Sequence, residues 1–468
     1  METQSGLLSY DVEEMVAGDK NNLWHHMKPH GVFDQQEQMI IVEGKGLIVT
    51  DIRGRKYLDA TSGGVWSVMV GYGRDSIADA VCEQMKKMPY FAGVFGNIPA
   101  IKFANKLLEK LPRLQKIYFS NSGSEANEKA FKIVRQAARL DADRKGKYKI
   151  LYRDRDYHGT TIATLSASGQ SERKDHFGPF VDGFVEVPQC LCYRCDFNKT
   201  YPDCKMECAT AVEDIILREG PETVGAIILE PITAGGGVLP PAKEYYPTVQ
   251  EICKRYGVWL IMDEVVCGFG RTGKFWGHEH YDVDPDMVTM AKGLASSYEA
   301  LSATAVKQEI YDIFINDVKD PEKRLDFFRD ISTYGGCTAP MTAALESTRI
   351  IEAENLVENS RKMGDYLLAQ LMTLKELPNV GDVRGVGLFC GVELVTDQQT
   401  NTPVTEQEMG ALMGNIFAEG LIVGRTNNSL PGMNTILNFA PCLTIIRDEI
   451  DQIVAGVKKA IEKTFRVS

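Results

Sequence analysis

Two short segments constrain the fold of this chain more than any other feature. The first is the apolar run Val258–Val265, which contains Asp263 near its end. The second is an apolar run about thirty positions later that ends in Met290-Ala291-Lys292-Gly293. Each pattern is typical of a buried strand followed by an ionisable residue. In an open α/β sheet, ligands bind outside the carboxyl ends of the strands, so we expect Asp263 and Lys292 to point into one crevice.

A carboxylate and a lysine in one crevice suit pyridoxal phosphate. The lysine amine can condense with the cofactor aldehyde, and the acid can keep the pyridine nitrogen protonated so that the ring withdraws electrons. The alternative is a structural ion pair between Asp263 and Lys292, which is common at strand ends. These two segments alone do not decide between a cofactor site and an ion pair.

A third segment has the pattern of an anion-binding turn. The apolar run Lys116–Phe119 leads into the small polar residues Ser120–Asn127 and then into a helical pattern over Lys129–Leu140. A strand, a turn and a helix start in that order present free backbone N–H groups and a helix dipole to an anion. The hydroxyls of Ser122 and Ser124 make phosphate a natural ligand, although a plain N-cap would have the same pattern.

An aromatic residue follows another predicted strand. The run Lys149–Tyr152 precedes Asp156–Gly159, which contains Tyr157 and His158. The Tyr157 ring could stack on a flat cofactor, although such residues also occur in loops without a function.

Taken together, these segments resemble the class III aminotransferases, the ω-amino acid type that uses pyridoxal phosphate. The resemblance runs from about Ile48 to the last helical pattern, and its motifs occur in a fixed order. They are Ser122–Ala126, Tyr157–Gly159, Glu230-Pro231, Met262–Val265 with Gly270–Gly273, Ala291–Leu294 and Ser332–Gly336.

The resemblance implies a role for each matching residue. Lys292 would form the Schiff base with the cofactor and Asp263 would pair with its ring nitrogen, so these two are the candidate catalytic residues. The cofactor would be held by further residues. Tyr157 and Val265 would lie on opposite faces of the ring, His158 and Glu230 near it, and Ser122, Gly123, Ser124 and the neighbouring subunit's equivalent of Thr333 at the phosphate.

The resemblance also implies the fold class, which is that of the fold-type I α/β transferases. We expect a large domain with a mostly parallel central sheet over residues 61–341. Residues 1–60, an N-terminal arm and a short meander, would join the C-terminal residues 342–468 in a smaller α+β domain. Because Thr333 would complete the phosphate site of a second subunit, the expected assembly is a homodimer with shared active sites, and a tetramer remains open.

Composition narrows the function classes. The chain has 468 residues and a net charge of -12, without a lysine or arginine stripe, so nucleic acid and anionic membranes are poor candidate partners. It has no apolar run of membrane-spanning length and no secretory signal pattern, which predicts a cytoplasmic protein. Eleven cysteines in so large a chain favour reduced thiols.

Five of these cysteines lie in one insertion, Cys190–Cys208. The spacing Cys192-x-x-Cys195 followed by Cys204-x-x-x-Cys208 has the look of a zinc knuckle. Buried or structural thiols explain the same pattern, because cysteine often packs as a small apolar residue. We therefore expect no metal site, with zinc as the alternative.

Four residues are candidates for substrate binding. By resemblance, Trp66 would form the wall of the substrate pocket, and Trp24 and Phe91 could extend it, although core packing explains both. Arg425 matches the mobile arginine that receives an acid group in this family, and its guanidinium suits carboxylate or sulfonate oxygens. A surface arginine after a strand is the alternative.

Within the family, three stretches resemble the branch that transfers the amino group of taurine to pyruvate. They are Asp59–Trp66, Asn121–Gln136 and Phe328–Cys337. In that branch Cys337-Thr338 replaces the usual His-Pro, whereas Glu299 departs from the common apolar residue and is expected to point away or pair with a cation. The implied reaction yields sulfoacetaldehyde and L-alanine.

Other functions fit the sequence less well. The main alternative is a β-alanine or broad ω-amine:pyruvate aminotransferase, because β-alanine differs from taurine only in its acid group. An aminomutase would use the same Lys292 and Asp263 without net transfer to free pyruvate. A non-catalytic binding protein on this fold would be expected to lack one of these two residues.

Overall fold

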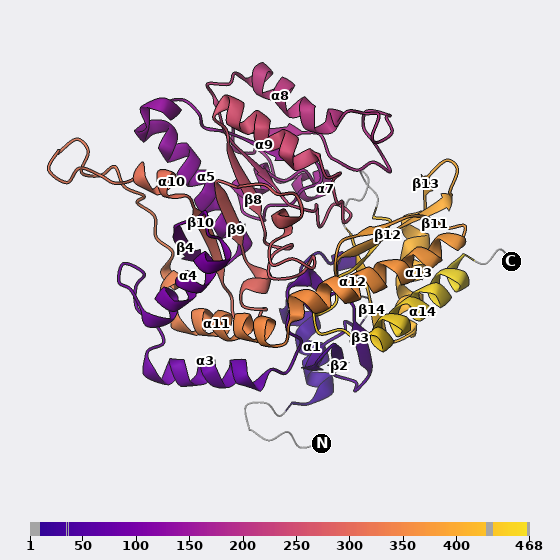
Figure 1. Cartoon of the computed structure of the whole chain (residues 1–468). Helices are drawn as coiled ribbons and strands as arrows, with labels where there is room; N and C mark the ends of the chain where they lie inside the picture. The colour runs from indigo at the N-terminus through magenta and orange to yellow at the C-terminus, as the bar shows by residue number, and fades with distance from the viewer. Residues whose placement is uncertain (1–9, 34, 36, 427–433, 466–468) are drawn as a thin grey trace.

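The structure is a computed structural model that describes residues 10–33, 35, 37–426 and 434–465. Its central element is a seven-stranded sheet with helices on both faces (Figure 1). Across the sheet the strands are β4 (Lys116–Ser120), β10 (Ser302–Val306), β9 (Met287–Met290), β8 (Trp259–Asp263), β7 (Val224–Leu229), β5 (Lys149–Arg153) and β6 (Phe184–Val187).

This sheet is mostly parallel. Strands β9, β8, β7, β5 and β6 pair in parallel, whereas β10 is antiparallel to both β9 and β4. Strands β7 and β9 are buried along their whole length, as continuous apolar strands are when helices cover both faces of a parallel sheet. The mostly parallel α/β sheet predicted from the sequence is confirmed, and the carboxyl ends of β7, β8 and β9 lie at one edge.

Alternate side chains of the central strands face opposite helical layers, as the two-residue period of a strand requires. Ile228 and Ile261 pack in the cluster that contains α5, whereas Ile227 and Leu260 pack in the cluster that contains α8 and α9. The helices of this part of the chain are α3 (Asp75–Lys87), α4 (Ile98–Lys110), α5 (Gly123–Leu140), α6 (Ile162–Ser166), α7 (Ser171–Lys174), α8 (Glu207–Glu219), α9 (Tyr245–Tyr256), α10 (Gln308–Asp312) and α11 (Thr338–Ala353).

Two smaller sheets lie beside the large one. The first has the order β1-β2-β3-β14, and the second the order β11-β12-β16-β15 with β13 paired to β12. These strands are β1 (Ile41–Lys45), β2 (Ile48–Asp51), β3 (Lys56–Asp59), β11 (Val380–Gly385), β12 (Cys390–Asp397), β13 (Thr402–Pro403), β14 (Leu421–Ile422), β15 (Gly424–Arg425) and β16 (Ile436–Phe439). Because β14 pairs in parallel with β3, the C-terminal part of the chain completes a sheet begun near the N-terminus.

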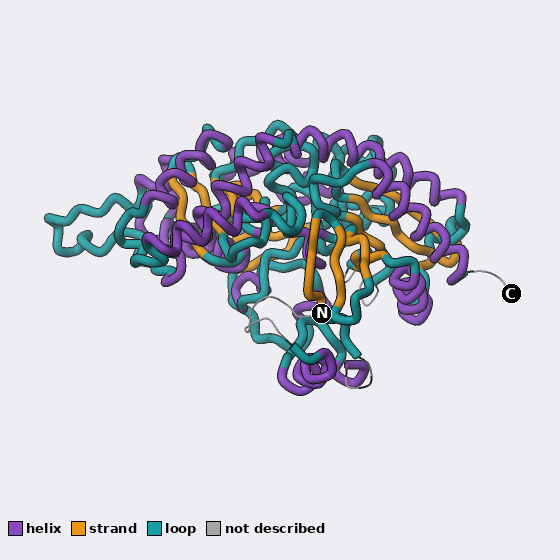
Figure 2. Tube along the Cα trace, turned by 90° about the horizontal axis from the view of Figure 1, so that it is seen from below, coloured by secondary structure: helices purple, strands orange, loops and turns teal. Residues whose placement is uncertain are grey.

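Helices cover these smaller sheets on the side that faces the viewer in Figure 1. They are α12 (Leu356–Met372), α13 (Glu406–Ala418) and α14 (Arg447–Thr464), while α1 (Val12–Asn22) and α2 (His30–Phe33) precede the first strand. Helices α11 and α12 are separated at Asn355, which has a φ of 51°. The tube view shows α1 projecting below the sheets (Figure 2).

A buried arginine ties the large sheet's loops to the smaller sheets. Arg271 donates from Nη1 to the carbonyls of Leu388 and Pro441 and from Nη2 to Ser62 Oγ. Burial lowers the pKa of Arg271 to about 10. These carbonyl and hydroxyl acceptors bind the two terminal nitrogens and fix the segments on both sides of the central crevice, while Nε is buried without a partner among the described residues.

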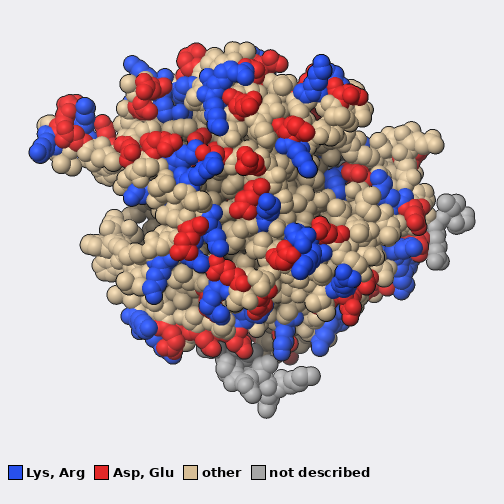
Figure 3. All heavy atoms as spheres, in the orientation of Figure 1, with Lys and Arg blue, Asp and Glu red and all other residues tan. Residues whose placement is uncertain are grey.

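Charged side chains of both signs are interspersed over the face shown in Figure 3. Among the described residues, none of the helices has both the length and the apolar character needed to cross a membrane.

Two helical glycines should respond in opposite ways to an added methyl group. A Cβ on Gly364 of α12 would lie 2.2 Å from the carbonyl carbon of Gly387, whereas a Cβ on Gly410 of α13 would have no atom within 4 Å. We expect Gly364→Ala to lower the free energy of unfolding by about 1–3 kcal/mol through overpacking. Gly410→Ala should raise it by up to about 1 kcal/mol, because alanine favours a helix. Thermal unfolding of both variants checks the pair, and equal melting temperatures would contradict it.

Candidate active site

The carboxyl ends of β7, β8 and β9 open into a cavity of about 650 Å³. Most of the residues that the sequence singled out lie in its wall. They are Trp66, Ser122, Gly123, Ser124, Tyr157, His158, Glu230, Asp263, Val265, Lys292 and Arg425. The structure therefore places Asp263 and Lys292 at one cavity, as their positions after neighbouring strands predicted.

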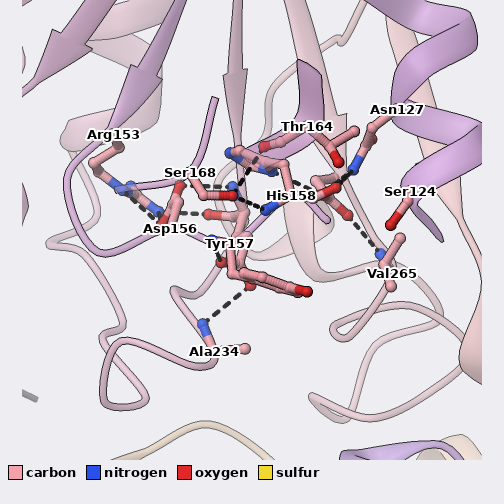
Figure 4. Close-up of polar contacts among 12 residues, drawn as sticks. Ser124, Asn127, Arg153, Asp156, Tyr157, His158, Thr164, Ser168, Ala234 and Val265 are labelled. Carbon is pink, nitrogen blue, oxygen red and sulfur yellow. Dashed lines mark hydrogen bonds and ion pairs between the residues drawn. The ribbon is translucent and has the colours of Figure 1, made fainter. Parts of the chain in front are cut away.

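Asp263 ends β8 and is almost fully buried, at 2% exposure. Its Oδ2 accepts hydrogen bonds from Asn127 Nδ2 and from His158 Nδ1, both at 2.8 Å, and its Oδ1 accepts one from the Val265 backbone N–H at 3.0 Å (Figure 4). These donors satisfy the buried carboxylate and fix its orientation. An acid held this way suits a cationic ring nitrogen above it.

His158 reaches Asp263 from the loop that follows β5. Its backbone N–H donates to Ser168 Oγ, and its carbonyl accepts from Asn127 Nδ2. The Nδ1–H bond to Asp263 leaves Nε2 buried without a partner among the described residues. Asn127, on the first turns of α5, holds both His158 and Asp263, and the sequence reasoning assigned it no role. Its spacing of three residues from Ser124, on one helix face, was the available signal.

Lys292 follows β9 with a φ of 44°, an unusual conformation for a residue with a side chain. Its Nζ lies 5.6 Å from the centre of the Trp66 ring. Burial lowers the pKa of Lys292, and the positive charge of Arg173 adds to the effect, while Glu230 and Asp263 oppose it. A lysine with a lowered pKa is more often neutral, which is the state that a nucleophile or a proton acceptor needs.

Glu230 directly follows β7 and is buried at 3% exposure. Its Oε1 accepts from the Tyr157 backbone N–H at 2.7 Å, and its Oε2 accepts from the Ala234 N–H at 3.1 Å. Burial raises the pKa of Glu230 well above its ordinary value, and the charges of Asp156 and Asp263 raise it further. Through these two backbone hydrogen bonds Glu230 positions the Tyr157 loop.

The start of α5 forms the anion-binding end of the cavity. Ser122 caps this 18-residue helix by accepting from the Glu125 N–H, and Ser124 Oγ accepts from the Thr160 N–H at 3.0 Å. The N–H groups of Gly123 and Ser124 precede the first intrahelical bonds, so they can receive an anion. A Cβ on Gly123 would lie 3.1 Å from Val265 Cγ1, so glycine leaves room between the helix start and Val265.

Two arginines also line the cavity. Arg425 is bound to Glu406 through Nη2 and donates from Nε to the Asn434 carbonyl at 2.7 Å. Arg173, on α7, lies 4.6 Å from the centre of the Tyr157 ring and donates to Gln170 Oε1 at 2.7 Å. Within the described part of the chain Arg173 has no ion pair. The sequence reasoning missed it, because a four-residue helix gives no pattern that points it at Tyr157.

Three of the predicted site residues lie away from this cavity. Trp24 is 82% exposed and Phe91 is 51% exposed, and Thr333 lies on the surface at the start of the short helix Thr333–Gly336. In a single chain Trp24 and Phe91 do not line the cavity, although the segment that carries Trp24 reaches it through His26 and Met27. Their substrate role and the cofactor role of Thr333 remain predictions that require a second chain.

Glu299 lies in the cavity wall, which corrects the expectation that it points away or pairs with a cation. It has no ion pair within the described ranges, and burial raises its pKa. The neutral form is therefore favoured relative to a free glutamate, which lessens the conflict with an anionic ligand.

The cysteine insertion forms a cluster of its own. Cys190, Cys192, Cys195, Cys204 and Cys208 line one small cavity away from Lys292, and all are free thiols. Among the described residues no three histidine, cysteine or acidic side chains are arranged to hold a metal ion.

Comparison with known proteins identifies the family. The aminotransferase class-III model matches residues 32–461. The hypotaurine/taurine--pyruvate aminotransferase of Paracoccus denitrificans is 51% identical, over 97% of this chain and 98% of that protein. The taurine--pyruvate aminotransferase of Bilophila wadsworthia is also 51% identical, over 98% of this chain and 100% of its own length.

Solved structures agree with these relatives. A Bacillus anthracis aminotransferase superimposes with a TM-score of 0.91 at 42% identity, covering 96% of this chain and 98% of that one. The ω-transaminase of Pseudomonas jessenii in complex with PMP gives a TM-score of 0.90 at 30% identity, covering 96% and 98%. The fold class predicted from the sequence, that of the fold-type I transferases, is confirmed, and the chain belongs to the class-III aminotransferase family.

Proposed function

We propose that this aminotransferase uses pyridoxal 5'-phosphate to transfer the amino group of taurine to pyruvate, yielding sulfoacetaldehyde and L-alanine. The observation that carries the proposal is that one cavity is lined by Lys292, the buried acid Asp263 and two arginines. The names of relatives that are 51% identical over nearly the whole chain support the choice of taurine and pyruvate.

The residues of the cavity fit the cofactor. The open N–H groups at the start of α5 would hold its phosphate, Tyr157 and Val265 would enclose its ring, and Asp263 would pair with the ring nitrogen. The space kept by Gly123 next to Val265 supports this fit, since a larger residue would fill it. When bound, pyridoxal phosphate supplies an aldehyde for linkage to an amine and a ring that withdraws electrons from the adjacent carbon.

Lys292 would carry out the proton transfers. Its Nζ would hold the cofactor covalently when no substrate amine is bound, and the freed amine would accept a proton from the amine-bearing carbon of the substrate and return it to the cofactor. The lowered pKa of Lys292 keeps the acceptor form available. Asp263 remains an acceptor throughout, held in place by Asn127 and His158.

The acid group of the substrate would bind at the arginines. Arg173 lies beside Tyr157 and has no carboxylate partner among the described residues, so its guanidinium can receive a sulfonate at no loss of an existing ion pair. Arg425 would have to exchange Glu406 for the substrate. Its side chain is 24% exposed and that of Glu406 is 53% exposed, and such exposed pairs contribute only about 0.2–1 kcal/mol.

The proposal includes a homodimer. Large apolar side chains are exposed on two adjacent segments, Phe91, Val94 and Phe95 on one and Ile331 and Tyr334 on the other. An isolated bridge between Tyr90 and Cys337 joins these segments into one surface. An exposed apolar surface of this kind is typical of a subunit interface, and a second copy there would bring Thr333 to a neighbouring phosphate site.

A comparison of amines tests the substrate. With pyruvate as acceptor, we expect alanine to form fastest from taurine or hypotaurine and more slowly from β-alanine and γ-aminobutyrate at equal concentration, with ping-pong kinetics. A preference for β-alanine or for unsubstituted amines would instead support the alternative function, a β-alanine or broad ω-amine:pyruvate aminotransferase. Release of no free aldehyde would indicate an aminomutase.

Replacement of Lys292 tests the covalent link and the proton transfer together. Lys292→Ala should lower kcat by about 10³-fold or more, because a positioned proton carrier is lost. After borohydride treatment, intact-protein mass should show the added cofactor in the parent and none in the variant. Lys254→Ala, an exposed lysine on α9, is the matched control and should retain both properties. Attachment of the cofactor to the Lys292→Ala protein would refute the assignment.

Replacement of Arg173 tests the sulfonate site. Arg173→Gln should raise KM for taurine about 10-fold or more, since hydrogen bonds to a charged group contribute about 1.5–3 kcal/mol. KM for propylamine, which has no acid group, should change little. Lys174→Gln, the neighbouring cation, controls for the loss of charge alone.

The same variant should shift the pH dependence. The positive charge of Arg173 lowers the pKa of Lys292, so its removal raises that pKa. Lys292 accepts protons only in its neutral form, which predominates above its pKa, so the midpoint of the rising limb of kcat should move to higher pH in Arg173→Gln. A midpoint that stays in place or moves down would contradict the electrostatic link.

A further inference from the structure

Asn438 lies in the cavity wall on β16 and has no role in the reaction described so far. Its side chain is buried, at 1% exposure, and its Oδ1 accepts a hydrogen bond from Trp66 Nε1 at 2.8 Å. The bond links β16 to the segment that carries Trp66. The Trp66 ring in turn lies 5.6 Å from Lys292 Nζ.

The chemistry of tryptophan fixes the orientation of the Asn438 amide. An indole N–H is a donor only, so the oxygen of the amide must face Trp66 and the NH₂ group must point elsewhere. Among the described residues no acceptor binds Asn438 Nδ2, and the side chain, although 1% exposed, lies in the cavity wall. Because Asn438 lines the cavity, its unused N–H donors are available to a ligand there.

The backbone beside Asn438 is built to admit this amide. Gly424 of β15 pairs with Asn438, and a Cβ on Gly424 would lie 2.0 Å from Asn438 Oδ1. Any larger residue at Gly424 would displace the amide from its bond to Trp66. The next residue, Arg425, pairs with Leu437, and its side chain also lines the cavity.

Trp66 is itself held in an uncommon conformation. Its φ is 64°, after Gly63 and Gly64 with φ values of 84° and 82°. The ring packs edge-on against Phe389 with centroids 5.6 Å apart. Both the backbone and the packing therefore restrict the indole, and a restricted indole N–H can hold the amide in one of its two orientations.

We propose that Asn438 is a substrate-binding residue, whose Nδ2–H group donates to the acid group of the bound amine or keto acid in the orientation set by Trp66. The inference rests on the proposed function in that both substrates carry such an acid. It adds an uncharged donor to the two arginines. An amide N–H can bind sulfonate or carboxylate oxygens without adding another positive charge to the cavity.

The variant Asn438→Asp separates the two properties of the amide. Aspartate retains an acceptor for the Trp66 N–H, but it replaces the donor with a negative charge that repels an anion. For each half-reaction we expect the apparent affinity for taurine, β-alanine and pyruvate to fall about 10-fold or more, in line with the loss of a hydrogen bond to a charged group. The apparent affinity for propylamine should change less than about two-fold by the same reasoning.

Two further variants keep the test decisive. Asn415→Asp, an equivalent change on α13 where the amide bonds Thr464 Oγ1, should leave all affinities unchanged. Trp66→Phe removes the indole N–H that fixes the amide, so it should weaken binding of the acid-bearing substrates by less than Asn438→Asp does. Tryptophan fluorescence of Asn438→Asp should match the parent if Trp66 keeps its place.

The outcomes distinguish this inference from the proposed function. An Asn438→Asp protein with parental affinity for the acids, or with an equal loss for propylamine, would overturn the role of Asn438. A parent enzyme that prefers β-alanine to taurine would overturn the proposed substrate, yet the affinity for β-alanine would still test Asn438.

Discussion

The active site depends on the burial of a carboxylate at the end of a parallel strand. Asp263 stands at the carboxyl end of β8 with almost no access to solvent, where an unsatisfied charge would be strongly unfavourable. Its donors come from three separate segments: Asn127 from α5, His158 from the loop after β5 and Val265 from the turn that follows β8. To satisfy one acid, the fold must therefore bring the helix start, the aromatic loop and the strand end to a single point, which is where a phosphate and a ring can be held together.

A second buried network supports the first. Arg153, fully buried, bonds Asp156 and the carbonyl of Glu230, while Asp156 accepts from the Glu230 backbone N–H. These bonds connect the ends of β5 and β7, so that Tyr157 and Glu230 keep a fixed relation. The raised pKa of Glu230 follows from this arrangement, since a third negative charge beside Asp156 and Asp263 is disfavoured in a buried site.

The sequence predicted those parts of the molecule that local pattern determines. Buried strands with a terminal acid or lysine, and a helix start with small polar residues, each have a local signature, so Asp263, Lys292 and Ser122 were found at one cavity. The reversed direction of β10 has no such signature, because direction depends on the connection and not on the strand's own residues. Arg173 reaches the Tyr157 ring because the chain folds back between these two residues, and no local pattern indicates that contact. Trp24 and Phe91 illustrate the converse, since residue type alone does not show that an aromatic side chain is exposed in the single chain.

The two substrates explain why one cavity contains several anion-binding groups at different positions. In pyruvate the carboxylate is bonded directly to the reacting carbon, whereas in taurine one further carbon separates the sulfonate from it. With the reacting carbon fixed beside Lys292, the two acid groups cannot occupy the same point. A single rigid cation would therefore fit one substrate at the expense of the other. Arg173 beside Tyr157, and Arg425 in a weak pair with Glu406, provide cations on different elements, one of them exchangeable. A donor such as Asn438 can serve either acid, because it requires only an oxygen within reach and carries no charge that must be neutralised when the site is empty.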